Sequence, residues 1–403
     1  MNQIERLLHT LAPKGVEFRK LGEVINILKG KQLNKELLLN YGEYPVMNGG
    51  IHASGYWNEY NTDCPKIIIS QGGASAGYVN YMTSKFWAGA HCYAIELNSE
   101  KLNYKFLYYF LKNSQTILMK SQFGAGIPAL NKADIETLTI PIPPLEIQQE
   151  IVKILDAFTE LNTELNTELK ARKKQYQYYQ NMLLDFNDIN SNHKDAKEKL
   201  AQKTYPKRLQ TLLHTLAPKG VEFRKLGEVC EILDNRRIPI AKNKRNPGIY
   251  PYYGANGIQD YIDSYIFDGD FVLVGEDGSV INKDNTPVVN WASGKIWVNN
   301  HAHVLQTKNE LKLKFLYFYL QTIDVSYCVA GTPPKINQEN LKKITIPIPP
   351  LEIQQEIVKI LDQFSILTTD LLAGIPAEIK ARKKQYEYYR EKLLTFKPLQ
   401  NKE

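Results

Sequence analysis

The sequence has little cysteine and no long apolar run. Its four cysteines, Cys64, Cys92, Cys230 and Cys328, lie too far apart for the spacing of a zinc-binding pair. We expect them to be buried, reduced thiols. No uninterrupted apolar run approaches the roughly 18–20 residues of a membrane span, and the first residues lack the basic-then-apolar layout of a signal peptide. These absences predict a cytoplasmic chain with no membrane partner.

Catalytic motifs are equally scarce. The sequence has no GxxxxGK[ST] phosphate loop and no Asn-Pro-Pro-Tyr or Asp-Pro-Pro-Tyr motif of amino-methyltransferases. Residues 123–126 (FGAG) are a poor methyl-donor loop, because a proline follows at 128 and no strand precedes them. His301 and His303 have the strand spacing of a metal pair. Because no carboxylate or thiol accompanies them in the sequence, a structural or ligand-facing role is favoured for the two histidines. We therefore predict no catalytic residue and no metal site.

What is present is the composition of a globular protein. The 403 residues are 43% hydrophobic and 23% charged, which suffices for ordinary cores and for about two or three domains. The 50 Lys and Arg residues exceed the 43 Asp and Glu residues, so the formal net charge is +7. A modest positive charge permits a nucleic-acid partner without requiring one.

The chain repeats itself in three identical segments. These are LLHTLAPKGVEFRKLGEV at 7–24 and 212–229, TIPIPPLEIQQEIVKILD at 139–156 and 345–362, and KARKKQY at 170–176 and 380–386. The intervening stretches, 25–138 and 230–344, share only a skeleton. Identical segments can meet identical partners, whereas divergent segments can bind different ligands. Recent duplication followed by drift is the alternative, but drift alone does not explain such sharp edges.

Each divergent stretch predicts a compact mixed α/β domain. Buried strands are expected at 66–69 and 271–274, because each is an apolar run followed directly by a glycine-containing turn. Helices with an apolar face are expected at 104–111 and 313–320. The same fold is therefore expected twice, with different surfaces.

A long helix is expected after each domain. Each is preceded by Ile-Pro-Ile-Pro-Pro, a stiff extended segment, at 140–144 and 346–350. The apolar spacing that follows is close to a heptad, which predicts that the two helices pair as an antiparallel coiled coil. Its predicted seam residues, also assigned to partner binding, are Ile147, Ile151, Ile154, Phe158, Leu161, Leu165, Ile353, Ile357, Ile360, Phe364, Leu367 and Leu371.

The first helix contains a four-residue repeat, Thr-Glu-Leu-Asn, within residues 159–170. Each unit adds about 6 Å at 1.5 Å per residue. The second helix carries Gly374 and Pro376 in the corresponding region, which predicts a kink or a break. We interpret this as a length-setting region.

Polar loop residues of the divergent stretches suit base recognition, because Arg and Lys pair with guanine, and Asn and Gln with adenine. Any polar loop would offer such residues, so each one alone is weak evidence. Helical tracts at 170–174 and 380–384 add positive charge, which fits either a solvated face or contact with phosphate or an acidic partner. The predicted DNA-binding residues are Lys29, Lys31, Gln32, Asn48, Ser70, Gln71, Ser75, Tyr78, Asn235, Arg236, Arg237, Tyr253, Asn256, Ser279, Lys283, Asn299 and Asn300.

This pattern resembles the DNA specificity subunit of type I restriction-modification systems. The resemblance covers essentially the whole chain. One departure is the doubled Gln beside Ile147 and Ile353, where the family often has Glu-Gln. The resemblance rests on Pro141, Pro143, Pro144, Leu145, Gln148 or Gln149, Ile151 and Leu155, their copies within 347–361, and the segments 18–24 and 223–229.

The resemblance implies an α+β fold with a pseudo-twofold internal repeat. Two tandem α/β target recognition domains are separated by two long helices that form an antiparallel coiled coil. The implied boundaries are 1–144 for target recognition domain 1, 145–205 for the central helical spacer, 206–350 for target recognition domain 2, and 351–403 for the C-terminal helical spacer.

The resemblance also implies a function without catalysis. Each domain would read one half of a bipartite, asymmetric site in double-stranded DNA, and the helices would set the gap. The helices would also recruit two methyltransferase subunits and, through them, restriction or translocase subunits. S-adenosylmethionine and ATP with Mg²⁺ would serve those partners, and this chain would hold no cofactor.

Two other classes stay open from the residues alone. A scaffold with two domains for ligands other than DNA would ignore duplex DNA even beside a methyltransferase. A fused endonuclease–methyltransferase would need catalytic motifs that the sequence lacks.

Overall fold

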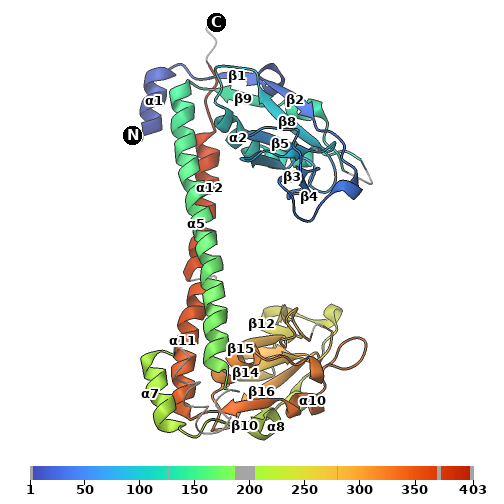
Figure 1. Cartoon of the computed structure of the whole chain (residues 1–403), viewed down its shortest axis with the longest axis vertical. Coiled ribbons are helices and arrows are strands. Elements are labelled where there is room, and N and C mark those ends of the chain that lie inside the picture. Colours follow the sequence, from blue (N-terminus) through green and yellow to red (C-terminus); the bar gives the residue numbers. More distant parts are fainter. Residues whose placement is uncertain (1–2, 125–127, 187–204, 279, 370–373, 400–403) are drawn as a thin grey trace. The chain divides into compact units, whose positions relative to one another are not determined.

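The computed structural model describes residues 3–124, 128–186, 205–278, 280–369 and 374–399. The chain divides into unit 1, residues 1–166 and 378–403, and unit 2, residues 167–377. The division at 166/167 falls inside the Thr-Glu-Leu-Asn repeat. Each unit therefore contains one globular domain and a part of each helical segment (Figure 1).

The globular domain of unit 1 is a mixed α/β structure. Its main sheet has four strands in the order β2-β8-β5-β6, and a three-stranded sheet has the order β4-β3-β7. Its elements are α1 (Gln3–Leu11), β1 (Glu17–Lys20), β2 (Ile25–Lys29), β3 (Tyr44–Met47), β4 (Gly55–Trp57), β5 (Lys66–Ser70), β6 (Val79–Met82), β7 (Trp87–Ala88), β8 (Cys92–Leu97), α2 (Tyr104–Asn113), α3 (Gln115–Lys120), α4 (Lys132–Glu136) and β9 (Thr139–Ile142).

Unit 2 has the same plan with one continuous sheet. Six strands follow the order β11-β16-β14-β15-β12-β13. Its elements are α7 (Lys207–Leu216), β10 (Glu222–Lys225), α8 (Leu226–Val229), β11 (Cys230–Ile232), β12 (Pro247–Gly254), β13 (Gly257–Ile262), β14 (Phe267–Gly275), β15 (Val289–Val298), β16 (Ala302–Thr307), α9 (Leu313–Leu320), α10 (Gln338–Lys343), β17 (Thr345–Ile348) and α11 (Leu351–Thr369).

The sheet arrangements of the two units differ at one strand. In unit 1 the short strands β6 and β7 lie in separate sheets, whereas in unit 2 the long β15 joins both regions. The parallel pairing is the same in both, since Met47 opposes Ala88 in unit 1 and Tyr253 opposes Val298 in unit 2. The predicted strands at 66–69 and 271–274 and the helices at 104–111 and 313–320 are confirmed within β5, β14, α2 and α9.

The identical segments pair with each other within each unit. In unit 1, β1 runs antiparallel to β9, with Phe18 opposite Pro141. In unit 2, β10 runs antiparallel to β17, with Phe223 opposite Pro347. The proline-rich segment predicted as an extended lead into a helix is thus also one strand of a two-stranded ribbon. The ribbon's register is the same in both units.

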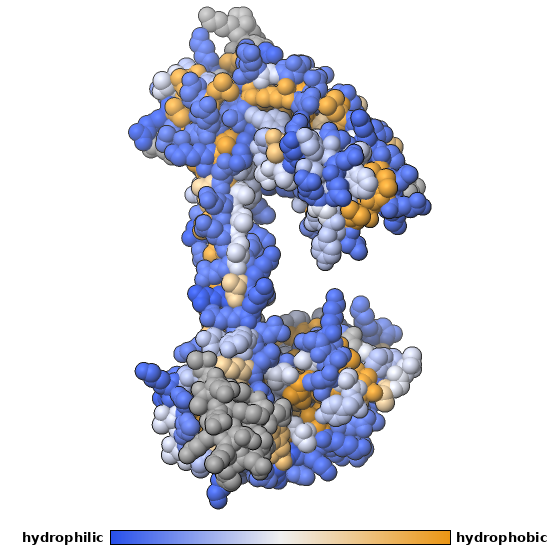
Figure 2. Space-filling view, viewed as in Figure 1, coloured by the Kyte–Doolittle hydropathy of each residue, from blue (hydrophilic) through white to orange (hydrophobic). Residues whose placement is uncertain are grey.

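Two helices lie side by side and antiparallel in each unit (Figure 1). In unit 1, α5 (Leu145–Leu184) meets α12 (Gly374–Leu393), and Phe158 stacks on Tyr389 with ring centroids 5.6 Å apart. In unit 2, Tyr179 of α5 stacks on Phe364 of α11 at 5.2 Å. The predicted break is confirmed at Gly374, whose φ of +70° does not occur within a right-handed α-helix. The visible face of these helices is mostly hydrophilic (Figure 2), as expected when the apolar faces meet.

The predicted seam residues fall into two groups. Ile147, Ile151, Ile353 and Ile357 are at most 1% exposed and belong to the cores of the globular domains. They are not available to a partner, so the partner-binding part of their prediction is wrong. The residues along the helix pairs are partly buried: Ile154, Phe158, Leu161, Leu165, Ile360, Phe364 and Leu367. Leu371 lies outside the described residues.

One buried glutamine fastens each long helix to its domain. The Gln148 Oε1 atom accepts a hydrogen bond from the Asn103 backbone N–H at 2.7 Å. Its Nε2 donates to the carbonyl oxygens of Lys101 (2.8 Å) and Pro143 (2.6 Å). Gln354 makes the matching three bonds in unit 2, and both glutamines are fully buried. The first turn of each helix is therefore held in a fixed position on its domain.

Candidate nucleic-acid interface

A loop cluster at the end of the central strand has the same backbone bonding in both units. In unit 2 the Glu276 N–H donates to the His301 carbonyl (2.9 Å) and the Gly278 N–H to the Pro334 carbonyl (3.0 Å). The Ile336 N–H donates to the Glu276 carbonyl at 2.8 Å. These bonds join the turn at 276–278, His301 and the loop at 334–336. We call this arrangement the strand-end frame.

Unit 1 reproduces the strand-end frame bond for bond. The Gln71 N–H donates to the His91 carbonyl (2.9 Å), the Gly73 N–H to the Pro128 carbonyl (2.9 Å), and the Leu130 N–H to the Gln71 carbonyl (2.8 Å). The turn glycines match as well, since Gly73 and Gly278 have φ values of +79° and +78°. Glycine adopts such angles without strain. Unit 1's frame thus comprises 71–73, His91 and 128–130.

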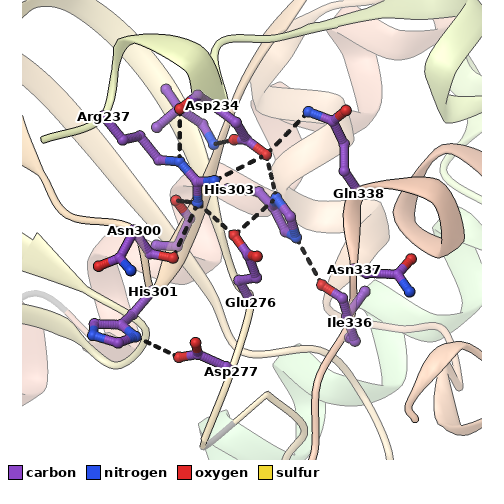
Figure 3. A network of polar contacts seen from close by, with 12 residues as sticks. Asp234, Arg237, Glu276, Asp277, Asn300, His301, His303, Ile336, Asn337 and Gln338 are labelled. Carbon is purple, nitrogen blue, oxygen red and sulfur yellow. Dashed lines mark hydrogen bonds and ion pairs between the residues drawn. The ribbon is translucent and has the colours of Figure 1, made fainter. Parts of the chain in front are cut away.

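Several side chains on this common frame differ between the units. In unit 2 the Arg237 Nη1 atom lies 2.6 Å from a Glu276 carboxylate oxygen and donates to the Ala302 carbonyl at 2.8 Å. The Asp234 carboxylate lies 2.6 Å from His303 Nδ1. The side chains of Arg237 and His303 are at most 11% exposed. Figure 3 shows how the contacts join them to the two carboxylates. Buried charges of opposite sign compensate one another here, and they make the loop rigid rather than reactive.

His303 is held at both ring nitrogens. Its Nε2 lies 2.8 Å from the Ile336 carbonyl oxygen, while Nδ1 faces the Asp234 carboxylate. Both neighbours are oxygen atoms, so two polar contacts fix the orientation of the ring. Burial tends to raise the pKa of Asp234, but the hydrogen bond from His303 and the positive charges of His303 and Arg237 outweigh it. The pKa of Asp234 therefore lies below its usual value.

A metal ion does not suit this cluster. Asp234, Glu276 and His303 could bring ligand atoms within 4.8 Å of one another. The Arg237 guanidinium already pairs with both carboxylates, and Lys335 adds a second cation 3.1 Å from Glu276. The positive charge that a metal would supply is thus present in the side chains. Of the two roles expected for His303, structural or ligand-facing, its burial favours the structural one. The expected lack of carboxylate neighbours was wrong, because Asp234 and Glu276 lie beside it.

The pH response of unit 2 follows from Asp234. Because its folded pKa is depressed, its stabilisation is complete above the unfolded value of about 3.9 and is lost as the pH falls through the folded pKa. We expect Asp234→Asn to lower the free energy of unfolding by about 3–5 kcal/mol at pH 7, because it breaks a buried ion pair. The difference from wild type is expected to shrink at pH 3. Urea unfolding at both pH values measures it, with the exposed Asp268→Asn as control; an equal difference at both pH values would contradict the assignment.

Two of the network positions carry neutral side chains in unit 1. Tyr93 replaces His303, and its hydroxyl donates to the Leu130 carbonyl at 3.3 Å, as His303 does to Ile336. Gln71 replaces Glu276. The two domains therefore present different chemistry from one scaffold.

Four predicted DNA-binding residues are occupied inside the protein, and their assignment is wrong. Ser70 is 5% exposed and donates to the Gly49 carbonyl at 2.7 Å. Asn299 is 3% exposed and accepts from the His301 N–H at 2.8 Å. Arg237 belongs to the buried network, and Tyr253 is 8% exposed in a core. In tight turns, nearby polar side chains form hydrogen bonds with the backbone groups of the turn.

The remaining predicted residues stay predictions. Ser279 lies outside the described residues. Asn48, Gln71, Ser75 and Tyr78 are partly buried at or near the frame of unit 1. The exposed ones are Lys29, Lys31, Gln32, Asn235, Arg236, Asn256, Lys283 and Asn300.

Both frames share an exposed histidine. Sequence reasoning singled out His301 for a structural or ligand-facing role but missed its counterpart His91. His91 and His301 occupy the same place, and each has its backbone N–H bound by an asparagine side chain, Asn48 at 3.2 Å and Asn299 at 2.8 Å. A pairwise alignment of the two halves at an offset of 210 would have found this match. Asp277, which contacts His301, was missed because its counterpart in unit 1 is Gly72.

These features define a class of protein: two copies of one α/β scaffold, joined by paired helices, with different side chains on a common loop frame. Comparison with known proteins agrees. The family model described as "Type I restriction modification DNA specificity domain" matches residues 13–175 and 218–381. The chain belongs to this family and is a specificity subunit with two such domains. In the described part of the chain, no helix combines the length and apolar character of a membrane span.

Individual relatives give the same result. A type I restriction enzyme specificity subunit of Haemophilus influenzae is 46% identical over 179 residues, which cover 43% of this chain and 46% of that protein. The MpnII specificity subunit of Mycoplasma pneumoniae is 30% identical over 339 residues, covering 68% and 94%. The crystal structure of an S subunit from M. genitalium matches with a TM-score of 0.61 at 20% identity, over 94% of this chain and 95% of that one, which supports the fold.

Proposed function

We propose that this chain selects the DNA sequence on which a type I restriction-modification complex acts. Each globular domain reads one half of a bipartite, asymmetric site in double-stranded DNA. The observation that carries the proposal is the strand-end frame: one backbone arrangement holds different side chains in the two units, and the partly exposed Asp277 of unit 2 stands where unit 1 has Gly72. Two domains that read different DNA sequences need different side chains at the contact positions. A shared backbone can hold both sets of side chains in equivalent places.

The helices set the gap between the half-sites and recruit two methyltransferase subunits. Support comes from the identical segments, which build the same ribbon and the same helix start in both units. Equal surfaces can bind equal partners. Restriction or translocase subunits join through the methyltransferases. Adenine N6 methylation with S-adenosylmethionine, and ATP- and Mg²⁺-dependent work, belong to those subunits in the cytoplasm, and this chain contributes no catalytic step.

Genome-wide mapping of methylated adenine tests this function. Cells that carry this gene with its neighbouring methyltransferase gene are compared with cells that lack only this gene. We expect a split, asymmetric motif, methylated on both strands, that disappears in the deletion strain. An unchanged methylation pattern would contradict the proposal and would favour a scaffold for ligands other than DNA.

A further inference from the structure

We propose that Asp277 and His301 form a specificity-determining pair in the second domain, which recognises an exocyclic amino group on a base edge. The inference rests on the proposed function and assigns one contact within it. Neither residue belongs to the residues expected from sequence to bind DNA.

The pair is rigid and faces outward. His301 Nδ1 lies 2.5 Å from Asp277 Oδ1, and the two side chains are 48% and 28% exposed. Both residues are held by their backbones, His301 through Asn299 and Asp277 through a bridge to Lys335. Figure 3 shows the pair turned toward each other and apart from the buried cluster around His303. Such support keeps a recognition group in a fixed position without the entropy cost of ordering a free side chain.

The chemistry of the pair is that of an acceptor. The Asp277 carboxylate accepts a hydrogen bond from His301 Nδ1 through one oxygen, and this contact fixes its orientation. The carboxylate itself carries further acceptor sites. In the major groove the donors on base edges are the amino groups of adenine and cytosine. An amino group at one position of the second half-site is therefore the expected ligand.

The first domain offers the matched comparison. His91 occupies the place of His301, but Gly72 stands where Asp277 does, so the histidine has no carboxylate there. A Cβ added to Gly72 would lie 3.6 Å from His91 Nδ1 and 3.9 Å from the Pro128 carbonyl oxygen, both ordinary contacts. The backbone of unit 1 can thus accept an aspartate at this position.

Methylation mapping in cells that carry the complete complex tests the pair with reciprocal variants. Asp277→Asn keeps an oxygen for His301 but replaces an outward acceptor with an amide donor. We expect it to reduce the preference for adenine or cytosine at one position of one half-site by about tenfold, with the other half-site unchanged. Gly72→Asp is expected to add such a preference in the other half-site. The base that is lost or gained distinguishes adenine from cytosine.

The outcomes separate the inference from the function. A wild-type motif that neither variant alters, or a uniform loss of methylation at all sites with the motif intact, overturns the pair. Changes from both variants in the same half-site also overturn it. Absence of any wild-type motif overturns the proposed function and this inference with it.

Discussion

Replacement of Gln148 by alanine is expected to lower the free energy of unfolding of unit 1 by about 3–5 kcal/mol. The change removes three hydrogen bonds and leaves one N–H and two carbonyl groups without partners in a fully buried place. Each such group costs about 1–3 kcal/mol. Gln148→Glu is also expected to destabilise, because a carboxylate cannot donate to the two carbonyls. Urea unfolding followed by circular dichroism measures both variants.

The neighbouring Gln149 supplies the control. It is exposed, and Gln149→Ala is expected to change stability by no more than about 0.5 kcal/mol. Gln354→Ala is expected to repeat the effect of Gln148→Ala in unit 2, because its three bonds are the same. Similar midpoints for the Gln148 and Gln149 variants would show that the buried bonds do not hold the helix on the domain.

Removal of residues 163–166, one Thr-Glu-Leu-Asn unit, is expected to shorten the gap between the half-sites by at most about two base pairs. The helix α5 is continuous through the repeat, and four residues span about 6 Å. One base pair occupies about 3.4 Å along DNA. The half-sites themselves are expected to stay unchanged, because the deletion lies at the division between the units, away from both frames. Methylation mapping gives the gap and both half-sites together.

A variant of equal length serves as the control for this deletion. Replacement of residues 163–166 by Ala-Glu-Leu-Lys keeps Leu165 and strong helix formers while changing the sequence. It is expected to leave the gap as in wild type. If the deletion keeps the wild-type gap, or if both variants alter it equally, the repeat does not set the length.

Regular, local features were predictable from the sequence. The apolar spacing after residues 144 and 350 predicted both long helices, and α5 and α11 begin at Leu145 and Leu351. The break at Gly374 was predictable because glycine and proline disrupt a helix wherever it packs. The domain boundaries beyond these points stay predictions.

The candidate site was predictable only in outline. Loop positions such as Asn300 and Gln71 lie at the frames, but the sequence could not separate them from Ser70 and Asn299, which bond to the backbone. Ser70 bonds to a residue 21 positions away and Asn299 to one 2 positions away. In the sequence, the residues that make such bonds and those that do not look alike, because both are polar and lie in loops. Gln148 was equally hidden beside Gln149, because only the packing of α5 on its domain makes one buried and the other exposed.

The sequence by itself determined the duplication, the identical segments within the helices and the divergence of the two domains, since these depend on identity and on the periods of local structure. Only the tertiary structure decided that the divergent loops share one backbone hydrogen-bonding arrangement, and that His91 and His301 occupy the same place in it. It also decided that Arg237 and His303 compensate buried carboxylates while Asp277 and His301 face outward. Such roles depend on distance and burial between residues remote in the chain, and hydrogen bonds and desolvation act through space rather than along the sequence.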